Sequence, residues 1–417
     1  MNGIFAVEKP SGITSSQFLS KLQRVLTSSE VFQKEIQAAR NVRIEQYKRE
    51  NKGKHPPNRI LNRVSKVKMG HGGTLDPLAS GVLVVGIGQG TKELANYLKG
   101  TIKCYEAEAL LGISTTSGDC EPNGEIISVN KTQHLQNLGE EAKKELEEDL
   151  VQKFKGHLKQ TPPIFAALKM NGKPLHEYAR EGLPLPKPIE PRQVQLYDLE
   201  FVKDDFLTSN HNYTFLQITD DTVKDLSKLS NNPTTTQLYY ADEYCTAKGL
   251  PLGEPIQQGT LQKNFICDPS DEELVKMKDP GYKAPLFHFI AKVSSGTYIR
   301  SLIDDMGKAL GSSAYMVSLK RLSQQNWDLN KGNVFKIEDF ENKPERVWST
   351  VLKKVLDQGA SIDIQKELQQ EQDACTTAKK EQKLDSDQAD DAEKIEDENN
   401  KDEQQIDIEP PTKKLKV

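Results

Sequence analysis

The sequence lacks the features by which a membrane-spanning, secreted or disulfide-bonded protein is usually recognised. Over its 417 residues, no apolar run approaches the ~20 residues that cross a bilayer. The amino-terminal segment MNGIFAVEK has no basic stretch followed by an apolar one, so it predicts neither a secretory signal nor a typical transit peptide. The five cysteines are scattered and form no C-x-x-C pair, which favours reduced thiols in an intracellular protein. We therefore expect no membrane contact, no disulfide framework and no cysteine metal site.

The formal net charge of −5 conceals an uneven distribution of charge along the chain. Residues 361–417 carry a net charge of −8, which leaves +3 on residues 1–360. Within those residues, the segment 31–68 holds eleven Lys and Arg against three Glu, a local net charge of +8. A basic segment of this density favours a polyanionic partner such as nucleic acid, and a solvated charged helix is the alternative.

Short strand-like segments alternate irregularly with helical ones, and the chain has no internal repeat. This pattern predicts an α+β fold with a large mixed, mainly antiparallel sheet flanked by helices. We expect one folded domain over residues 1–355, with a basic insertion at 27–68 and a polar insertion at 220–283. Residues 356–417 are rich in Glu, Asp, Gln and Lys and predict a disordered acidic tail. Strands are predicted at 3–8, 82–87, 101–111, 163–170, 192–202, 212–219 and 285–294, and helices at 139–155 and from Tyr298 onward.

One carboxylate stands out in a loop made mostly of glycine, small residues and leucine. Residues 70–81 read GHGGTLDPLASG and precede the apolar run 82–85, VLVV. The glycines allow a backbone or a ligand to approach closely, and Pro77 stiffens the chain directly after Asp76. The pattern predicts an acid held rigidly where a loop meets a buried strand. The alternative is a local turn in which Asp76 caps its own loop.

Three further segments supply residues suited to a site around this acid. Tyr105 lies in the predicted strand that follows the Asp76 loop, and Leu319 lies in LKRL on another predicted strand. Tyr298 and Arg300 are two residues apart in GTYIR, so in an extended stretch they share a face. Tyr105 and Arg300 each have an ordinary structural alternative. Tyr105 could be a half-buried core aromatic, and Arg300 could form a surface ion pair with Asp304, one helical turn further on.

Five ordered blocks of sequence carry a resemblance to a known family. They are 9–15 (KPSGITS), 70–81, 88–92 (GQGTK), 160–169 (QTPPIFAALK) with the following Gly172 and Lys173, and 296–300 (GTYIR). At these residues the chain resembles the stand-alone tRNA pseudouridine-55 synthases of the TruB family, in particular their fungal and other eukaryotic members. The resemblance covers most of residues 3–200 and 284–355, and makes residues 1–355 a pseudouridine synthase catalytic domain.

The resemblance implies the isomerisation of uridine to pseudouridine at position 55 in the T-loop of tRNA. The reaction breaks the N-glycosidic bond and rejoins ribose to uracil through carbon, without redox change, so no cofactor and no metal is expected. Asp76 would be the nucleophile that forms a covalent adduct with ribose or base. Arg300 would pair with Asp76, and Tyr105 would stack on the flipped-out uracil and take part in proton removal.

The resemblance also assigns the residues around these three. His71 would occupy the space that the flipped base vacates, and Tyr298 and Leu319 would line the pocket. Lys9 would support the loop that carries Asp76. The implied partner is the T-arm of tRNA, bound by a monomer, with mRNA left open as a further substrate.

Two alternative functions remain at this point. A guide-RNA-dependent relative would carry a carboxy-terminal RNA-binding domain, for which a folded portion ending near residue 355 leaves too little chain. An RNA-binding or tRNA-folding factor without catalysis is the second alternative, and the presence of Asp76, Tyr105 and Arg300 argues against it.

The end of the sequence predicts a localisation signal. Residues 410–417, PPTKKLKV, form a short basic cluster behind prolines, which is typical of a nuclear import signal read by an import receptor. We expect the nucleus, with mitochondrial and cytoplasmic pools left open.

Overall fold

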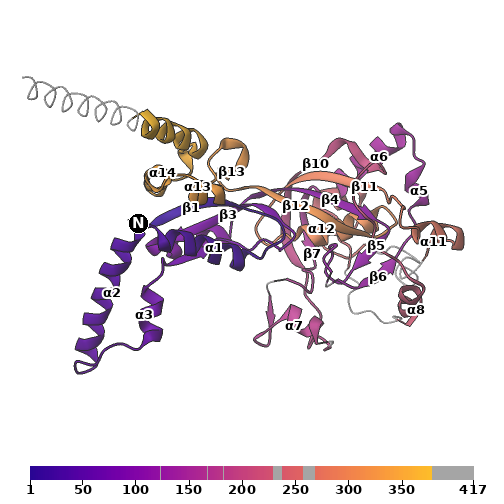
Figure 1. Cartoon of the computed structure of the whole chain (residues 1–417). Helices are drawn as coiled ribbons and strands as arrows, with labels where there is room; N and C mark the ends of the chain where they lie inside the picture. The colour runs from indigo at the N-terminus through magenta and orange to yellow at the C-terminus, as the bar shows by residue number, and fades with distance from the viewer. Residues whose placement is uncertain (123, 167, 182, 229–236, 257–267, 378–417) are drawn as a thin grey trace, which may run out of the picture.

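A computed structural model describes the chain from residue 1 to residue 377, except for residues 123, 167, 182, 229–236 and 257–267. Residues 378–417 lie outside the described residues, and with them the predicted import cluster and most of the acidic tail. Figure 1 shows one long sheet that runs across the molecule, with helices packed against it. Among the described helices, none is both long and apolar enough to span a membrane.

The sheet is large and almost entirely antiparallel, which confirms the predicted fold class. In the described part of the chain it has nine strands, in the order β1-β3-β12-β4-β11-β10-β7, with β2 paired to β3 and β13 paired to β12. Among the strand pairs of this sheet in the described residues, β12 with β3 is the parallel one. The strands are β1 (Gly3–Lys9), β2 (Met69–His71), β3 (Ser80–Ile87), β4 (Lys103–Leu111), β7 (Gly156–Gln160), β10 (Arg192–Thr208), β11 (Leu286–Val293), β12 (Ala314–Gln324) and β13 (Trp327–Asp328). Two small hairpins lie outside it, β5 (Ile113–Thr115) with β6 (Ile126–Val129) and β8 (Lys169–Met170) with β9 (Lys173–Pro174).

Helices cover the sheet and connect its strands. They are α1 (Ser15–Ser28), α2 (Glu30–Glu50), α3 (Asn58–Val64), α4 (Ala95–Leu98), α5 (Gln133–Gln136), α6 (Glu140–Phe154), α7 (Leu175–Arg180), α8 (Asp220–Lys228), α9 (Asp242–Lys248), α11 (Asp271–Met277), α12 (Ile299–Ala309), α13 (Ile337–Asn342) and α14 (Glu345–Gln358). The first helix shows why the sequence starts helices where it does. The Thr14 hydroxyl accepts the backbone N–H of Gln17, and the Gln17 side chain accepts the N–H of Thr14, which is a capping box.

The middle of the sheet positions the site because its strands are buried. β3 is apolar and buried from Gly81 to Ile87, as expected for a strand covered on both faces. β4 and β12 lie side by side, with Tyr105 directly opposite Arg321 and Ala107 opposite Leu319. The loop that carries Asp76 joins β2 to β3 and therefore leads into the buried centre of the sheet.

Several predicted boundaries were wrong. The folded part does not end at residue 355, because residues 364–377 are helical and bury Ile364 and Leu368 completely or nearly so. Of the predicted strand at 163–170, only Lys169–Met170 is a strand, since the prolines at its start remove backbone donors. The segment 212–219 is irregular, although its Phe215 and Ile218 are buried.

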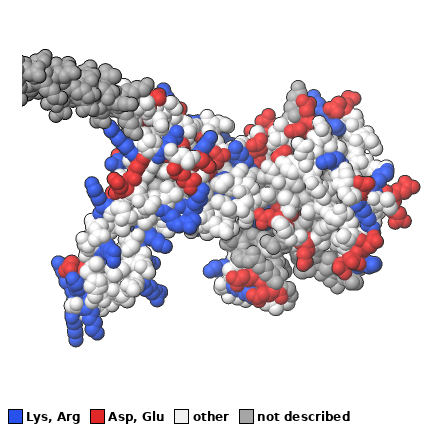
Figure 2. Space-filling model, in the orientation of Figure 1, with Lys and Arg blue, Asp and Glu red and all other residues white. Residues whose placement is uncertain are grey.

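The two predicted insertions behave differently. The polar insertion between β10 and β11 contributes α8, α9 and α11, and each of these helices buries an apolar residue, Leu226, Cys245 and Met277 respectively. The basic insertion forms a hairpin of α2 and α3 that extends away from the sheet (Figure 1). Figure 2 shows Lys and Arg side chains at the free end of this α2–α3 hairpin, whereas acidic side chains are common at the opposite end of the molecule.

Candidate active site

The Asp76 loop is shaped by one glycine that no other residue can replace. Gly81 has a φ of +101°, which disfavours residues with a Cβ. A Cβ at Gly81 would lie 2.2 Å from the carbonyl oxygen of Arg321. At the end of the Asp76 loop, the backbone of Gly81 therefore packs directly against the backbone of Arg321 on β12.

The amino-terminal elements hold one side of this loop. Lys9, at the end of β1, is fully buried, and its Nζ donates to the carbonyl oxygens of Pro10 at 2.8 Å, Pro77 at 3.3 Å and Ala79 at 2.6 Å. The Ser15 hydroxyl at the start of α1 donates to the Leu75 carbonyl at 2.9 Å and accepts the Leu75 N–H at 2.8 Å. Burial lowers the pKa of Lys9 to about 8, partly offset by the negative charges of Asp76 and Glu121.

Strand β12 holds the other side of the loop. Arg321 is 2% exposed, and its guanidinium donates to the carbonyl oxygens of Thr74 at 2.9 Å and Val82 at 3.2 Å. Its Nε donates to the Tyr105 hydroxyl at 3.2 Å. Gln324, three residues further along the same strand, donates to the Gly72 carbonyl at 2.7 Å. The acid thus sits in a loop whose backbone is fixed by buried side chains from three separate elements.

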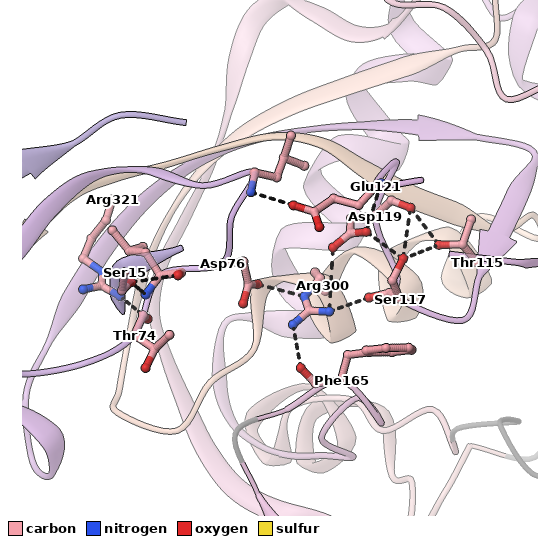
Figure 3. A network of polar contacts seen from close by, with 12 residues as sticks. Ser15, Thr74, Asp76, Thr115, Ser117, Asp119, Glu121, Phe165, Arg300 and Arg321 are labelled. Atoms are coloured by element: carbon pink, nitrogen blue, oxygen red, sulfur yellow. Dashed lines mark hydrogen bonds and ion pairs between the residues drawn. The ribbon is translucent and has the colours of Figure 1, made fainter. Parts of the chain in front are cut away.

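Arg300 meets Asp76 from the first turn of α12. Its Nε lies 3.0 Å from Asp76 Oδ2, and its other nitrogens donate to the carbonyl oxygens of Ser117 at 2.6 Å and Phe165 at 3.1 Å (Figure 3). The Arg300 side chain is 6% exposed and that of Asp76 is 34% exposed. The cation is therefore fixed and buried, while the carboxylate that it holds is open to a ligand.

The ion pair between Arg300 and Asp76 was predicted, and so was a helix from Tyr298 onward, which α12 confirms. The shared face of Tyr298 and Arg300 in an extended stretch was wrong. Tyr298 precedes α12 as its N-cap residue and Arg300 lies within the helix, so the two do not share the face of an extended stretch. Arg300 forms ion pairs with Asp76 and Asp119, and Asp304 pairs with Lys308 at 2.7 Å.

Two further carboxylates lie around Arg300. Asp119 is 5% exposed in its side chain, accepts the Ser117 hydroxyl at 2.6 Å, and has an oxygen 3.7 Å from the Arg300 guanidinium. Glu121 accepts the backbone N–H of Leu78 at 2.8 Å. Burial, together with the charge of Asp119, raises the pKa of Glu121. Asp119 thus contacts the Arg300 guanidinium, and Glu121 holds the backbone of the Asp76 loop at Leu78.

The other predicted site residues differ in burial and in their hydrogen-bond partners. Tyr105 and Leu319 are each 7% exposed and belong to the same apolar cluster as Leu75, a residue of the Asp76 loop. Tyr298 is half-buried, and Gln160 holds its peptide through bonds of 2.8 Å and 3.1 Å. Burial raises the pKa of Tyr298. His71 is half-buried on β2, its pKa is lowered by burial, and its Nδ1 has no hydrogen-bond partner among the described residues.

The structure adds residues that the sequence did not single out, above all Arg321 and Asp119. Arg321 stands in the LKRL segment, where only Leu319 was selected. A charged residue inside a strand that is otherwise buried is a usable signal, because such a side chain must find buried partners. Asp119 follows Gly118 in an irregular segment and gives no comparable signal.

The arrangement suits chemistry in which one carboxylate is the reacting group. Among the described residues, no group of three His, Cys, Asp or Glu could hold a metal ion. What the site offers is an open carboxylate, a buried arginine that orients it, and a buried tyrosine hydroxyl beside the same loop.

Comparisons with known proteins show which family the chain is similar to. The family model described as "TruB family pseudouridylate synthase (N terminal domain)" matches residues 59–219. The "tRNA pseudouridine synthase 4" of Saccharomyces cerevisiae is 55% identical over 369 residues, which are 88% of this chain and 88% of that protein. The protein of the same name from Schizosaccharomyces pombe is 34% identical over 358 residues, covering 81% and 82%. The "tRNA pseudouridine synthase B" of Lactobacillus gasseri is 28% identical over 331 residues, covering 79% and 71%.

The fold, the site and these matches define a class of isomerase, the pseudouridine synthases. Within that class the chain belongs to the TruB family.

Proposed function

We propose that this protein converts uridine to pseudouridine at position 55 in the T-loop of tRNA, with Asp76 as the nucleophile. The observation that carries the proposal is the ion pair between a buried Arg300 and a partly open Asp76, at 3.0 Å. The proteins from both yeasts and from Lactobacillus that it resembles are named as tRNA pseudouridine synthases, which supports tRNA as the substrate.

The reaction assigns a task to each of the central residues. The bond between the ribose C1′ and the uracil N1 breaks, a bond between C1′ and C5 forms, the C5 proton leaves and N1 gains a proton. Asp76 forms the covalent adduct that holds the separated fragment while the base turns over. Arg300 fixes the direction of the carboxylate and balances its charge in a site that excludes water.

The base must leave its stack to reach Asp76, at a cost of a few kcal/mol. Tyr105 presents a ring and a hydroxyl beside the Asp76 loop, and Arg321 Nε holds that hydroxyl at 3.2 Å. We assign to Tyr105 the stacking on the flipped uracil and a part in removal of the C5 proton. Tyr298 and Leu319 line the pocket, His71 takes the place of the flipped base, and Lys9 keeps the loop in position.

The direct test is to incubate purified full-length protein with an unmodified tRNA transcript and to map pseudouridine at single-nucleotide resolution. We expect one product at position 55, none with the Asp76→Asn variant, and none on a transcript with cytidine at that position. Product at another position, or equal product with Asp76→Asn, would contradict the proposal. The same mapping on an mRNA fragment folded into a similar stem-loop tests mRNA as a further substrate.

Two proposals concern the protein in the cell. The first is that the active form is a monomer. Residues 410–417, outside the described residues, are proposed as the signal for nuclear import. Replacing the three lysines Lys413, Lys414 and Lys416 by Gln should reduce nuclear accumulation and leave activity in vitro intact. Unchanged accumulation would mean that another segment carries the signal.

A further inference from the structure

We propose that the α2–α3 hairpin is a second RNA-binding element, which contacts the phosphate backbone of tRNA beyond the T-arm. The proposal rests on the proposed function for the identity of the RNA. It concerns a surface that is separate from the Asp76 site in both position and charge.

The charge of the hairpin opposes that of the rest of the folded chain. Residues 31–68 carry +8, whereas residues 1–360 together carry +3, so the remainder of those residues carries −5. The hairpin would therefore attract a polyanion more strongly than the rest of the folded chain does. Figure 2 shows this separation, with Lys and Arg at the free end of the hairpin.

Most of the basic side chains on the hairpin are available to a ligand. Of the eleven Lys and Arg, Arg43 lies 3.9 Å from Glu50 and Lys48 lies 2.8 Å from Glu45. The other nine have no carboxylate within ion-pair distance among the described residues. These nine are all exposed: Lys34, Arg40, Arg49, Lys52, Lys54, Arg59, Arg63, Lys66 and Lys68. Cations arranged only to solvate a helix usually alternate with acidic partners, which is not the pattern here.

The hairpin is fixed at its base. Glu345 of α14 accepts the backbone N–H groups of Glu30 at 3.0 Å and Val31 at 2.6 Å. The amino group of Met1 pairs with the Glu35 carboxylate. Phe32, near the base, is buried, whereas Val42, further along α2, is 68% exposed. An anchored base and an exposed free end present the cations at a defined place.

The position of the hairpin sets which part of an RNA it can reach. Ser15, the first residue of α1, contacts Leu75 beside the acid, and α1 spans about 21 Å before α2 begins. Helix α2 extends about 31 Å further. In Figure 1 the hairpin and α7 extend from the same side of the body, with α1 between them. An RNA whose uridine lies at Asp76 therefore reaches the free end only if it continues tens of ångströms past the T-loop.

The test removes cations from the hairpin and, as a matched control, from the opposite end of the molecule. Both variants replace four exposed side chains by Gln, so the change in net charge is equal. The hairpin variant changes Arg40, Arg49, Lys54 and Arg59. The control variant changes Lys131, Lys144, Lys155 and Lys276, which lie on or beside α5, α6 and α11. Circular dichroism and thermal melting verify that both variants fold.

Affinity is then measured by titration at several salt concentrations, for a complete tRNA and for an isolated T-arm stem-loop. For the complete tRNA, we expect the hairpin variant to bind about 10-fold or more weakly, with a salt slope that is smaller by about 2 to 4. The stem-loop should bind equally to all three proteins, and the control variant should match the unmodified protein on both RNAs.

Two results would overturn the proposal. Unchanged affinity and salt slope on complete tRNA would show that the hairpin is a solvated surface or binds another partner. Equal weakening on the stem-loop would place its contacts within the T-arm. Both readouts are affinities, so they stand apart from the isomerase assay, whose failure would overturn the proposed function instead.

Discussion

The loop around Asp76 and the α2–α3 hairpin lie at the two ends of α1, and they are built in different ways. In the loop, backbone carbonyls accept hydrogen bonds from the buried side chains of Lys9, Ser15 and Arg321, which come from three different elements. The hairpin has few buried apolar residues, and nine of its cations have no ion-pair partner within the described chain. In the Asp76 loop, the polar side chains bond the backbone and fix its geometry. On the hairpin, the basic side chains remain available to a ligand.

This difference separates chemistry from affinity. An acid that must attack a defined atom needs a backbone that does not move, which buried and fully bonded side chains provide. Phosphate contacts need charge in roughly the right place, and exposed flexible side chains suffice for them. Changes in the loop should therefore lower the rate, and changes in the hairpin should lower the affinity.

The largest effect is expected from Asp76→Asn. The amide keeps the size of the side chain but cannot form the adduct, so product formation should stop. Affinity for tRNA should stay within a few-fold, because it comes mainly from phosphate contacts elsewhere. Single-turnover assays and binding titrations on one preparation measure both quantities. Turnover near that of the unmodified protein would remove Asp76 from the role of nucleophile.

Arg300→Lys should be nearly as severe, with a loss of rate of about 100-fold or more. A lysine keeps the positive charge, but it cannot pair with Asp76 and also bond the carbonyl oxygens of Ser117 and Phe165 in the same plane. The rate at saturating tRNA is the relevant measurement. A variant that retains most of the rate would show that charge alone, without the fixed geometry, is sufficient.

Tyr105→Phe tests the hydroxyl that Arg321 holds. The ring still stacks, whereas proton transfer through the hydroxyl is lost, so the rate should fall about 100-fold with little change in affinity. Arg321→Lys should cost about 10-fold by itself. In the double variant the two losses should not multiply, because both act on one interaction. Multiplying losses would separate Arg321 from Tyr105 and leave it with the loop alone.

The smallest effect concerns pH. Burial lowers the pKa of Lys9 from 10.5 to about 8, and the three carbonyls that it bonds require a protonated amine. As pH rises through about 8, one donor is lost, the loop loosens, and we expect the rate at saturating tRNA to fall by less than 10-fold.

This fall in rate is not a loss of folding. Between pH 8 and 10.5 the folded state holds fewer protons on Lys9 than the unfolded state, so this group makes the free energy of unfolding larger as pH rises. Burial also lowers the pKa of Lys103 to about 8, and Lys103→Met serves as the control that should keep the pH step. Lys9→Met should remove the step, and a step that persists in this variant would belong to another group.

The sequence predicted the features that one contiguous segment carries, and it predicted poorly those that depend on contacts between distant segments. The Asp76 loop, the strand of Tyr105 and the basic insertion were readable from motif, alternation and charge. The network around the acid was predicted only in part. Lys9 was assigned to the Asp76 loop, but Arg321 was missed because it bonds the Thr74 carbonyl, far away in the chain. Asp119 was missed because it approaches Arg300 across a similar sequence separation. The end of the folded part was also missed, since the helix at 364–377 buries only a few apolar residues in a polar sequence.

The most direct test of this separation is a single-turnover assay at saturating tRNA, run side by side on Asp76→Asn and on the four-residue hairpin variant. With each variant's affinity for tRNA known, saturation removes any difference in binding. We expect no product from Asp76→Asn despite its near-normal affinity, and the full rate from the hairpin variant despite its weakened affinity. A slowed hairpin variant at saturation, or product from Asp76→Asn, would contradict this separation.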